Sequence, residues 1–212
     1  METPTENTLP QNYRTARGFC LTSAFWMVIA TLFGITTAIQ FIAPELLGNI
    51  SWLSFGRIRP IHTNLVIFGF VTPGLLSAGF YILPRLLQTE LYSEKLGMIT
   101  VFLWNLALVG AVITLAMGFT QGREYAELIW PLDLVVVLIF GLICFNLLMT
   151  VRQRKEPILY VSVWYICAAV ILTSFVYAIG NVIWVPGSGA LKGMPDAIIL
   201  WFYGHNVLGL LL

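Results

Sequence analysis

Long apolar runs recur along this chain and constrain its fold more than any other feature. Six stretches are almost free of charge, and each is close to or above the length needed to cross a bilayer core about 30 Å thick. They are residues 18–43, 60–83, 96–119, 130–150, 157–185 and 195–212. The sequence therefore predicts an all-α chain whose six helices form a polytopic transmembrane bundle.

Composition agrees with this class and excludes several others. Hydrophobic residues make up 58% of the chain and charged residues only 10%, whereas soluble domains average about 25% charged residues. With 11 basic and 10 acidic residues, no polybasic surface is available for nucleic acid. We expect a lipid bilayer around the chain and no nucleic-acid partner.

The two ends of the chain differ in character. Residues 1–17 are polar and contain no apolar segment of a signal peptide, so we expect a cytoplasmic tail followed by a transmembrane domain over residues 18–212. The last run is still apolar at Leu212. We interpret the sequence as a fragment truncated in the sixth helix.

Lysine and arginine residues predict the orientation in the membrane. On the side of the N-terminus there are seven: Arg14, Arg17, Arg85, Lys95, Arg152, Arg154 and Lys155. The opposite side has four: Arg57, Arg59, Arg123 and Lys192. Because cytoplasmic loops carry the excess of these residues, the N-terminus is expected in the cytoplasm.

The only two histidines, His62 and His205, fall within the second and sixth runs. Both helices enter from the predicted outer face, so both imidazoles are expected in the outer half of the bilayer. Neutral imidazole is the commonest protein ligand for metals, which favours a buried metal or haem site. An interfacial histidine is the alternative for His62. Arg57 and Arg59, just outside its helix, suit haem propionates, although ordinary snorkelling to the interface explains them too.

Three segments carry a family resemblance: GRIRPIHTNLVIFGF, QGREYAELIWPLD and WFYGHNVLG. Together they closely resemble the catalytic subunit I of the C-family haem-copper oxidases, the cbb(3)-type cytochrome c oxidases, and the likeness extends from about Ser51 to Leu212. The resemblance implies the N-terminal part of a twelve-helix fold, of which about six helices are present.

The same resemblance implies roles for individual residues. His62 matches an axial ligand of low-spin haem b, and His205 matches one of three histidines that hold the active-site copper. Arg57 matches an arginine near the haem propionates, with Arg59 as a weaker candidate.

Two further positions follow from the family pattern. Glu124 and Glu127 fall where the family places an acidic residue near a calcium ion, and we favour Glu124. Gly209, four residues after His205, matches the glycine of the C-family, whereas nitric oxide reductases have a glutamate there.

The function implied by the resemblance is that of a terminal respiratory oxidase. The complete subunit would reduce dioxygen to water at a centre of high-spin haem b and copper, with electrogenic proton uptake and translocation. It would lie in the bacterial inner membrane and receive electrons from cytochrome c through c-type cytochrome subunits. This chain supplies two of the six histidines that such a site needs, so the fragment alone is expected to be inactive. The alternatives are a nitric oxide reductase of the same superfamily and, from another class, a solute transporter.

Overall fold

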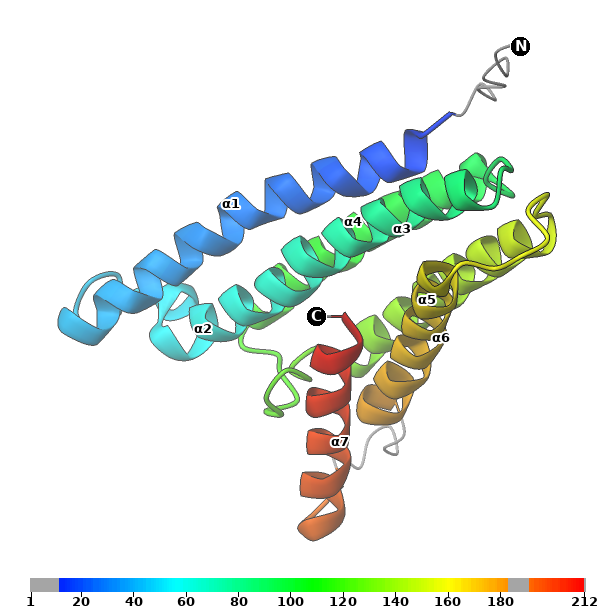
Figure 1. The fold of residues 1–212 in the computed structure, drawn as a ribbon. Coiled ribbons are helices and arrows are strands. Elements are labelled where there is room, and N and C mark those ends of the chain that lie inside the picture. Colours follow the sequence, from blue (N-terminus) through cyan, green and yellow to red (C-terminus); the bar gives the residue numbers. More distant parts are fainter. Residues whose placement is uncertain (1–11, 183–190, 212) are drawn as a thin grey trace.

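Helices make up the regular structure of the part of the chain that the computed structural model describes, residues 12–182 and 191–211. Figure 1 shows their arrangement. The elements are α1 (Arg14–Ile42), the short 3₁₀ helix η1 (Ser51–Leu53), α2 (Phe55–Asn64), the π-helix η2 (Leu65–Val71), α3 (Thr72–Leu86), α4 (Glu94–Met117), α5 (Trp130–Arg152), α6 (Val161–Val182) and α7 (Met194–Leu211). The predicted all-α fold class is confirmed.

Five helical spans in these described ranges are long and apolar enough to cross a membrane: Arg14–Ile42, Phe55–Leu86, Glu94–Met117, Trp130–Arg152 and Val161–Asn181. The second of these joins α2, η2 and α3 into one rod. The expected sixth segment does form a helix, α7, but it is not one of the five. Asp196, His205 and Asn206 interrupt its apolar sequence.

Three expected helix ends are wrong. The sequence predicts that the second run begins at Pro60 and stops before Pro84, but the helix starts at Phe55 and continues to Leu86. Proline removes one i→i−4 hydrogen bond, and near the ends of a long rod the remaining turns keep the backbone helical. The first helix likewise begins at Arg14, inside the expected tail.

Local signals explain where α4 begins and ends. The Ser93 side chain accepts a hydrogen bond from the Leu96 amide and caps the first turn. At the other end Gly118 has φ +87°, the left-handed conformation that glycine adopts readily. The N-termini of α1 and α4 are joined because the Thr15 amide donates to Glu94 Oε2 at 2.8 Å.

The helices form two groups that diverge from each other (Figure 1). α1 packs along the α2–η2–α3 rod and α4, while α5 contacts α4 and α6, and α7 packs on α6. Buried aromatic rings connect the two groups. They form a series of neighbouring rings: Phe19, Trp104, Phe140, Tyr177 and Tyr203.

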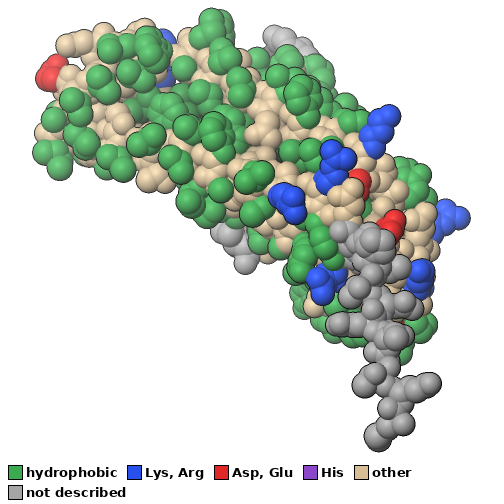
Figure 2. Space-filling model, turned by 90° about the horizontal axis from the view of Figure 1, so that it is seen from above, with side chains coloured by type: hydrophobic (Ala, Val, Ile, Leu, Met, Phe, Trp, Pro, Cys, Tyr) green, Lys and Arg blue, Asp and Glu red, His purple; other side chains and the backbone are tan. Residues whose placement is uncertain are grey.

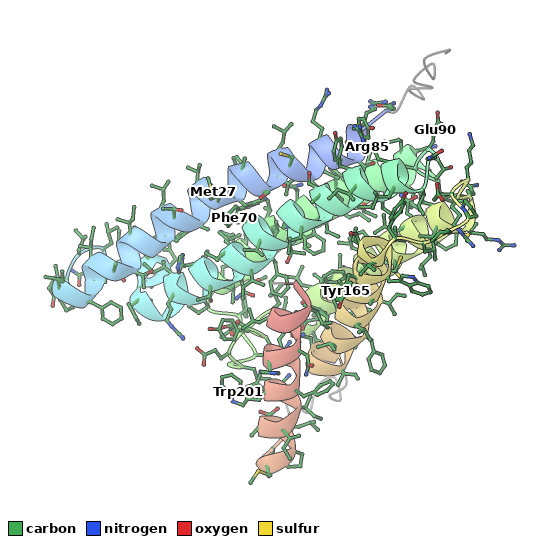
Figure 3. All side chains as sticks on the ribbon, viewed as in Figure 1. Met27, Phe70, Arg85, Glu90, Tyr165 and Trp201 are labelled. Atoms are coloured by element: carbon green, nitrogen blue, oxygen red, sulfur yellow. The ribbon has the colours of Figure 1, made fainter. Side chains whose placement is uncertain are left out.

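The outer surface is apolar along most of the length of the helices. Phe41 and Ile42 of α1 are 75% and 89% exposed, as expected for side chains in contact with lipid. On the face in Figure 2, Lys and Arg side chains gather toward one end. Arg85 and Glu90 lie at the end where α1 begins, and Trp201 lies on α7 away from it (Figure 3). The chain is therefore organised as a multi-pass membrane protein.

Candidate haem site and the loop above it

The imidazole of His62 is held by a backbone carbonyl of the neighbouring helix. Its Nδ1 atom lies 2.8 Å from the carbonyl oxygen of Ala30 on α1. A carbonyl oxygen only accepts hydrogen bonds, so Nδ1 must carry the proton. In the neutral ring the lone pair is then on Nε2, the arrangement common among metal-binding histidines.

Gly34, one turn further along α1, makes room for the same ring. A Cβ atom at this position would lie 2.6 Å from Cε1 and 2.8 Å from Nδ1 of His62. Any larger residue would therefore push the imidazole away from α1. Sequence reasoning did not identify Ala30 or Gly34, because neither side chain has polar chemistry to signal a role.

An open cavity of about 280 Å³ lies beside His62. Its lining is mainly apolar: His62, Thr63, Val66, Ile67, Val71, Tyr125 and Leu208. The volume of about 280 Å³ is just below the range for ligand pockets, about 300–1,000 Å³, and the cavity is open on one side. A histidine with a fixed tautomer beside an apolar opening fits a planar, largely apolar group such as haem.

Arg57 lies against the end of α4. Its Nη1 donates to the Ala116 carbonyl at 2.9 Å, and its guanidinium packs over Gly118. A cation at a helix C-terminus donates to a carbonyl that has no partner within the helix, and it interacts favourably with the negative end of the helix dipole. This contact uses one of the five N–H donors of the guanidinium, so the predicted propionate contact stays a prediction.

Arg59 forms an ion pair with Glu124 in the loop between α4 and α5. The Nη2–Oε1 distance is 2.5 Å, and the two side chains are 45% and 46% exposed. Exposed pairs of this kind contribute about 0–1 kcal/mol. The structure thus brings together two residues that the sequence had assigned to different ligands, a propionate and calcium.

Glu127, the other acidic residue of this loop, is buried. Its Oε2 accepts a hydrogen bond of 2.9 Å from Asn64, two residues after His62. Burial raises the pKa of the Glu127 carboxyl above its ordinary value, and the hydrogen bond from Asn64 only partly offsets this effect. The loop is thereby attached to the helix that carries His62.

Arg123 ties the same loop to the last two helices, whereas the sequence had used it only as a charge of the predicted outer face. Its Nη1 donates to the Gly180 carbonyl of α6 at 2.7 Å, and its Nε lies 3.1 Å from Oδ1 of Asp196 in the first turn of α7. The arginine side chain is only 4% exposed. Tyr203 of α7 also reaches the loop, where its hydroxyl donates to the Tyr125 carbonyl.

Close to Arg123, three further polar side chains form a buried hydrogen-bonded cluster: Gln121, Asp133 and Tyr177. The Tyr177 hydroxyl donates to Oδ1 of Asp133 at 2.8 Å, and Gln121 donates to Oδ2 at 2.6 Å. Asp133 is completely buried. Sequence reasoning did not find this group, because its three members lie on a loop and two different helices.

His205 is not brought into a metal cluster. It lies on α7 with an exposed side chain, and among the described residues no three His, Cys, Asp or Glu side chains come together as a metal site would require. The described residues alone therefore do not complete the three-histidine copper site that the sequence resemblance implied.

The apolar helices, connected to one another through the loop between α4 and α5, define a helical, multi-pass membrane protein. Residues 14–212 match the family described as Cytochrome C and Quinol oxidase polypeptide I. The chain belongs to this family, the subunit I of haem-copper oxidases.

Comparison with individual relatives shows which members of the family the chain resembles more. The chain is 33% identical over 205 residues to the Cbb3-type cytochrome c oxidase subunit CcoN1 of Stutzerimonas stutzeri, and the match covers 95% of this chain and 43% of that protein. It is 33% identical to cytochrome c oxidase subunit 1 of Rhodobacter capsulatus, covering 92% and 38%. A nitric oxide reductase of Stutzerimonas stutzeri is 26% identical, covering 70% and 34%. The chain thus spans less than half the length of these relatives, and its likeness favours the cbb3-type oxidases, as the three sequence segments had indicated.

Proposed function

We propose that the complete subunit to which this chain belongs is the catalytic subunit of a cbb3-type terminal oxidase, which reduces dioxygen to water with electrogenic proton uptake and translocation. Within it, His62 is an axial ligand of low-spin haem b. The observation that carries this assignment is the hydrogen bond from His62 Nδ1 to the Ala30 carbonyl, which leaves Nε2 for a metal.

The haem supplies one-electron transfer when it is bound. The residues of this chain hold and tune it. Ala30 keeps the proton on Nδ1 of His62 and raises the basicity of the ligand, and Gly34 lets the ring lie close to α1. Val66, Ile67 and Val71 provide an apolar wall of the cavity against which the porphyrin would pack. The remaining N–H donors of Arg57, and more weakly those of Arg59, are proposed to bind the propionates.

His205 is proposed as one ligand of the active-site copper, with its partner ligands in parts of the subunit outside this chain. Glu124 is the preferred calcium ligand, since its exposed pair with Arg59 costs little to exchange, whereas Glu127 is buried against Asn64. The ligand of the second haem b, like the other copper ligands, is proposed to lie in parts of the subunit outside this chain.

Partners and location follow from the relatives and from the charge distribution. We assign the subunit to the bacterial inner membrane, with residues 1–17 in the cytoplasm. The proposed electron donors are c-type cytochrome subunits and, through them, cytochrome c. The seven Lys and Arg residues on one side against four on the other support this orientation.

Substitution of the two histidines in the complete oxidase tests the assignment. His62→Ala should remove the low-spin haem b band from the reduced-minus-oxidised spectrum, while His205→Ala should lower the copper content and retain that band. Elemental analysis and optical spectra measure both. The ligand assignments are wrong if both variants keep the parental spectrum, copper content and turnover.

A nitric oxide reductase is the second candidate, because one relative carries that name. Gly209 argues against it, since the resemblance places a glutamate there in nitric oxide reductases. Purified complex that consumes nitric oxide but not dioxygen, or that holds iron in place of copper, would establish this alternative. The family assignment gives no support to a solute transporter.

A further inference from the structure

The helix that carries His62 changes its winding directly after the histidine. Residues Leu65–Val71 form a π-helix, in which the amide of Thr72 bonds to the carbonyl of Ile67, five residues earlier. Isolated π-helical turns are rare and occur often at functional sites. This one contributes Val66, Ile67 and Val71 to the cavity beside His62.

One carbonyl of the π segment has lost its regular partner. In π winding the carbonyl of Phe68 would accept from the amide of residue 73, but this residue is proline and has no N–H. The indole Nε1 of Trp104 on α4 donates to the Phe68 carbonyl instead, at 2.8 Å. Trp104 is 2% exposed and Phe68 6%, so water does not replace this donor.

A second carbonyl of the segment is also served from outside. The Ser23 hydroxyl of α1 donates to the Phe70 carbonyl at 2.7 Å. Side chains from two neighbouring helices, α4 and α1, therefore donate to carbonyls of the π segment, and the Trp104 indole does so where Pro73 has no amide to offer. This arrangement stabilises π winding against a return to the regular α-helix.

The winding decides which side chain faces the cavity. In a regular α-helix each residue turns about 100°, so Val71 would lie about 180° from His62, and Phe70 would lie between His62 and Thr63. The π segment turns less per residue. As a result Val71 lines the cavity, whereas Phe70 (labelled in Figure 3) does not and is 37% exposed.

We propose that the π segment Leu65–Val71 sets the register of the haem-facing wall, and that Trp104 is the positioning residue that holds this register through the Phe68 carbonyl. The π segment keeps the small side chain of Val71 in the wall and the ring of Phe70 out of it. This inference rests on the proposed role of His62 as a haem ligand.

The first test removes the indole donor in the complete oxidase. Trp104→Phe keeps an aromatic ring beside Phe19 and Phe140 but cannot bond the Phe68 carbonyl. We expect a shift of the reduced haem b band and of its midpoint potential, with a loss of haem b from the purified complex.

Trp26→Phe is the matched control. Trp26 is another buried indole, 5% exposed, and its Nε1 bonds a side chain, Asn105, rather than the π segment. Its Cβ and Cγ are the atoms that a Cβ added at Gly69 would meet first, and phenylalanine retains both. The control should keep the parental haem band and potential. Equal shifts in the two variants, or none in either, would overturn the proposal.

A rescue experiment separates register from general stability. Pro73→Ala restores an amide that can serve the Phe68 carbonyl, so the double variant Trp104→Phe/Pro73→Ala should recover part of the lost haem b and reverse the shift. Failure to recover either would contradict the proposed role of Trp104.

If Trp104→Phe does not accumulate in the membrane, a second substitution tests whether the π segment keeps Val71 in the cavity wall. Val71→Phe places a ring in the cavity wall and should abolish most haem b binding. Val109→Phe, at a position 44% exposed on α4, adds the same ring outside the cavity and should retain haem b. Unchanged haem b in Val71→Phe overturns the inference. If His62→Ala keeps the low-spin band, the ligand assignment itself fails, so the two failures are distinguishable.

Discussion

The carbonyl oxygen of Ala30 lies 2.8 Å from Nδ1 of His62 and joins α1 to the helix that carries the candidate haem ligand. The two residues are 32 positions apart in the sequence. The bond fixes both the tautomer and the plane of the ring. Helix α1 therefore shapes the candidate haem site through the Ala30 carbonyl and the space at Gly34.

Gly34→Ala should displace the imidazole, because the new Cβ would lie 2.6 Å from its Cε1 atom. We expect a shifted low-spin haem band and a lower haem b content, measured by reduced-minus-oxidised spectroscopy of the complete oxidase. Gly141→Ala on α5 is the control, since nothing lies within 4 Å of the added methyl group. A parental spectrum for Gly34→Ala would show that the ring does not depend on this contact.

The Glu127→Gln variant should be more stable to unfolding than the parent protein, and the difference should grow as pH rises above 4.5. Burial raises the pKa of Glu127 above its ordinary value of 4.5, so the folded state binds this proton more tightly than the unfolded state. The stability that the protonated carboxyl contributes is present below pH 4.5 and is lost as pH rises through the raised pKa. Glutamine stays neutral and still accepts from Asn64.

The measurement is the unfolding midpoint of both proteins in detergent as a function of pH. The two curves should approach each other near pH 4.5 and separate above it, with the glutamine variant more stable. A difference that does not vary with pH would contradict the raised pKa.

Arg123→Met should destabilise the fold strongly, because it leaves Asp196 without its cation and the Gly180 carbonyl without its donor. Breaking a buried ion pair by removing one partner costs about 3–5 kcal/mol. Asp196 keeps some exposure, 23%, so we expect a value near the lower end. Denaturant unfolding in detergent measures it.

Arg59→Met provides the comparison for Arg123. Its pair with Glu124 is about half exposed, so its loss should change the free energy of unfolding by about 0–1 kcal/mol. Similar losses for the two variants would mean that Arg123 does not tie the loop to α6 and α7 in the way described.

Tyr177→Phe should also be destabilising, by about 1–3 kcal/mol, because it removes a hydrogen bond from the completely buried carboxyl of Asp133. Tyr165→Phe removes a hydroxyl from a side chain that is 74% exposed and should change little. The same unfolding assay compares them, and equal stability of the two variants would be evidence against the Tyr177–Asp133 bond.

Several features of this protein could be predicted from local sequence. Apolar run length sufficed for the all-α membrane fold, because a helix that crosses a bilayer must satisfy its backbone internally whatever its neighbours are. The expected boundaries at Pro60 and Pro84 were wrong, since a proline removes one bond but does not end a long, well-packed helix.

The partners of the charged side chains required three dimensions. Arg57, Arg59, Glu124 and Glu127 were singled out from the sequence, but the contacts of Arg57 with Ala116, of Arg59 with Glu124 and of Glu127 with Asn64 were not. Each contact joins residues more than fifty positions apart. No periodicity within one helix encodes such a pair.

The sequence by itself determined the membrane class, the family resemblance and the two histidines, because hydropathy and short motifs are properties of adjacent residues. Only the tertiary structure decided that Ala30 and Gly34 hold His62, that Trp104 serves the carbonyl which Pro73 leaves unpaired, and that Arg123 links the loop to α6 and α7. The physical reason is that a hydrogen bond depends on distance and direction between atoms, and helix packing brings those atoms together from distant parts of the chain.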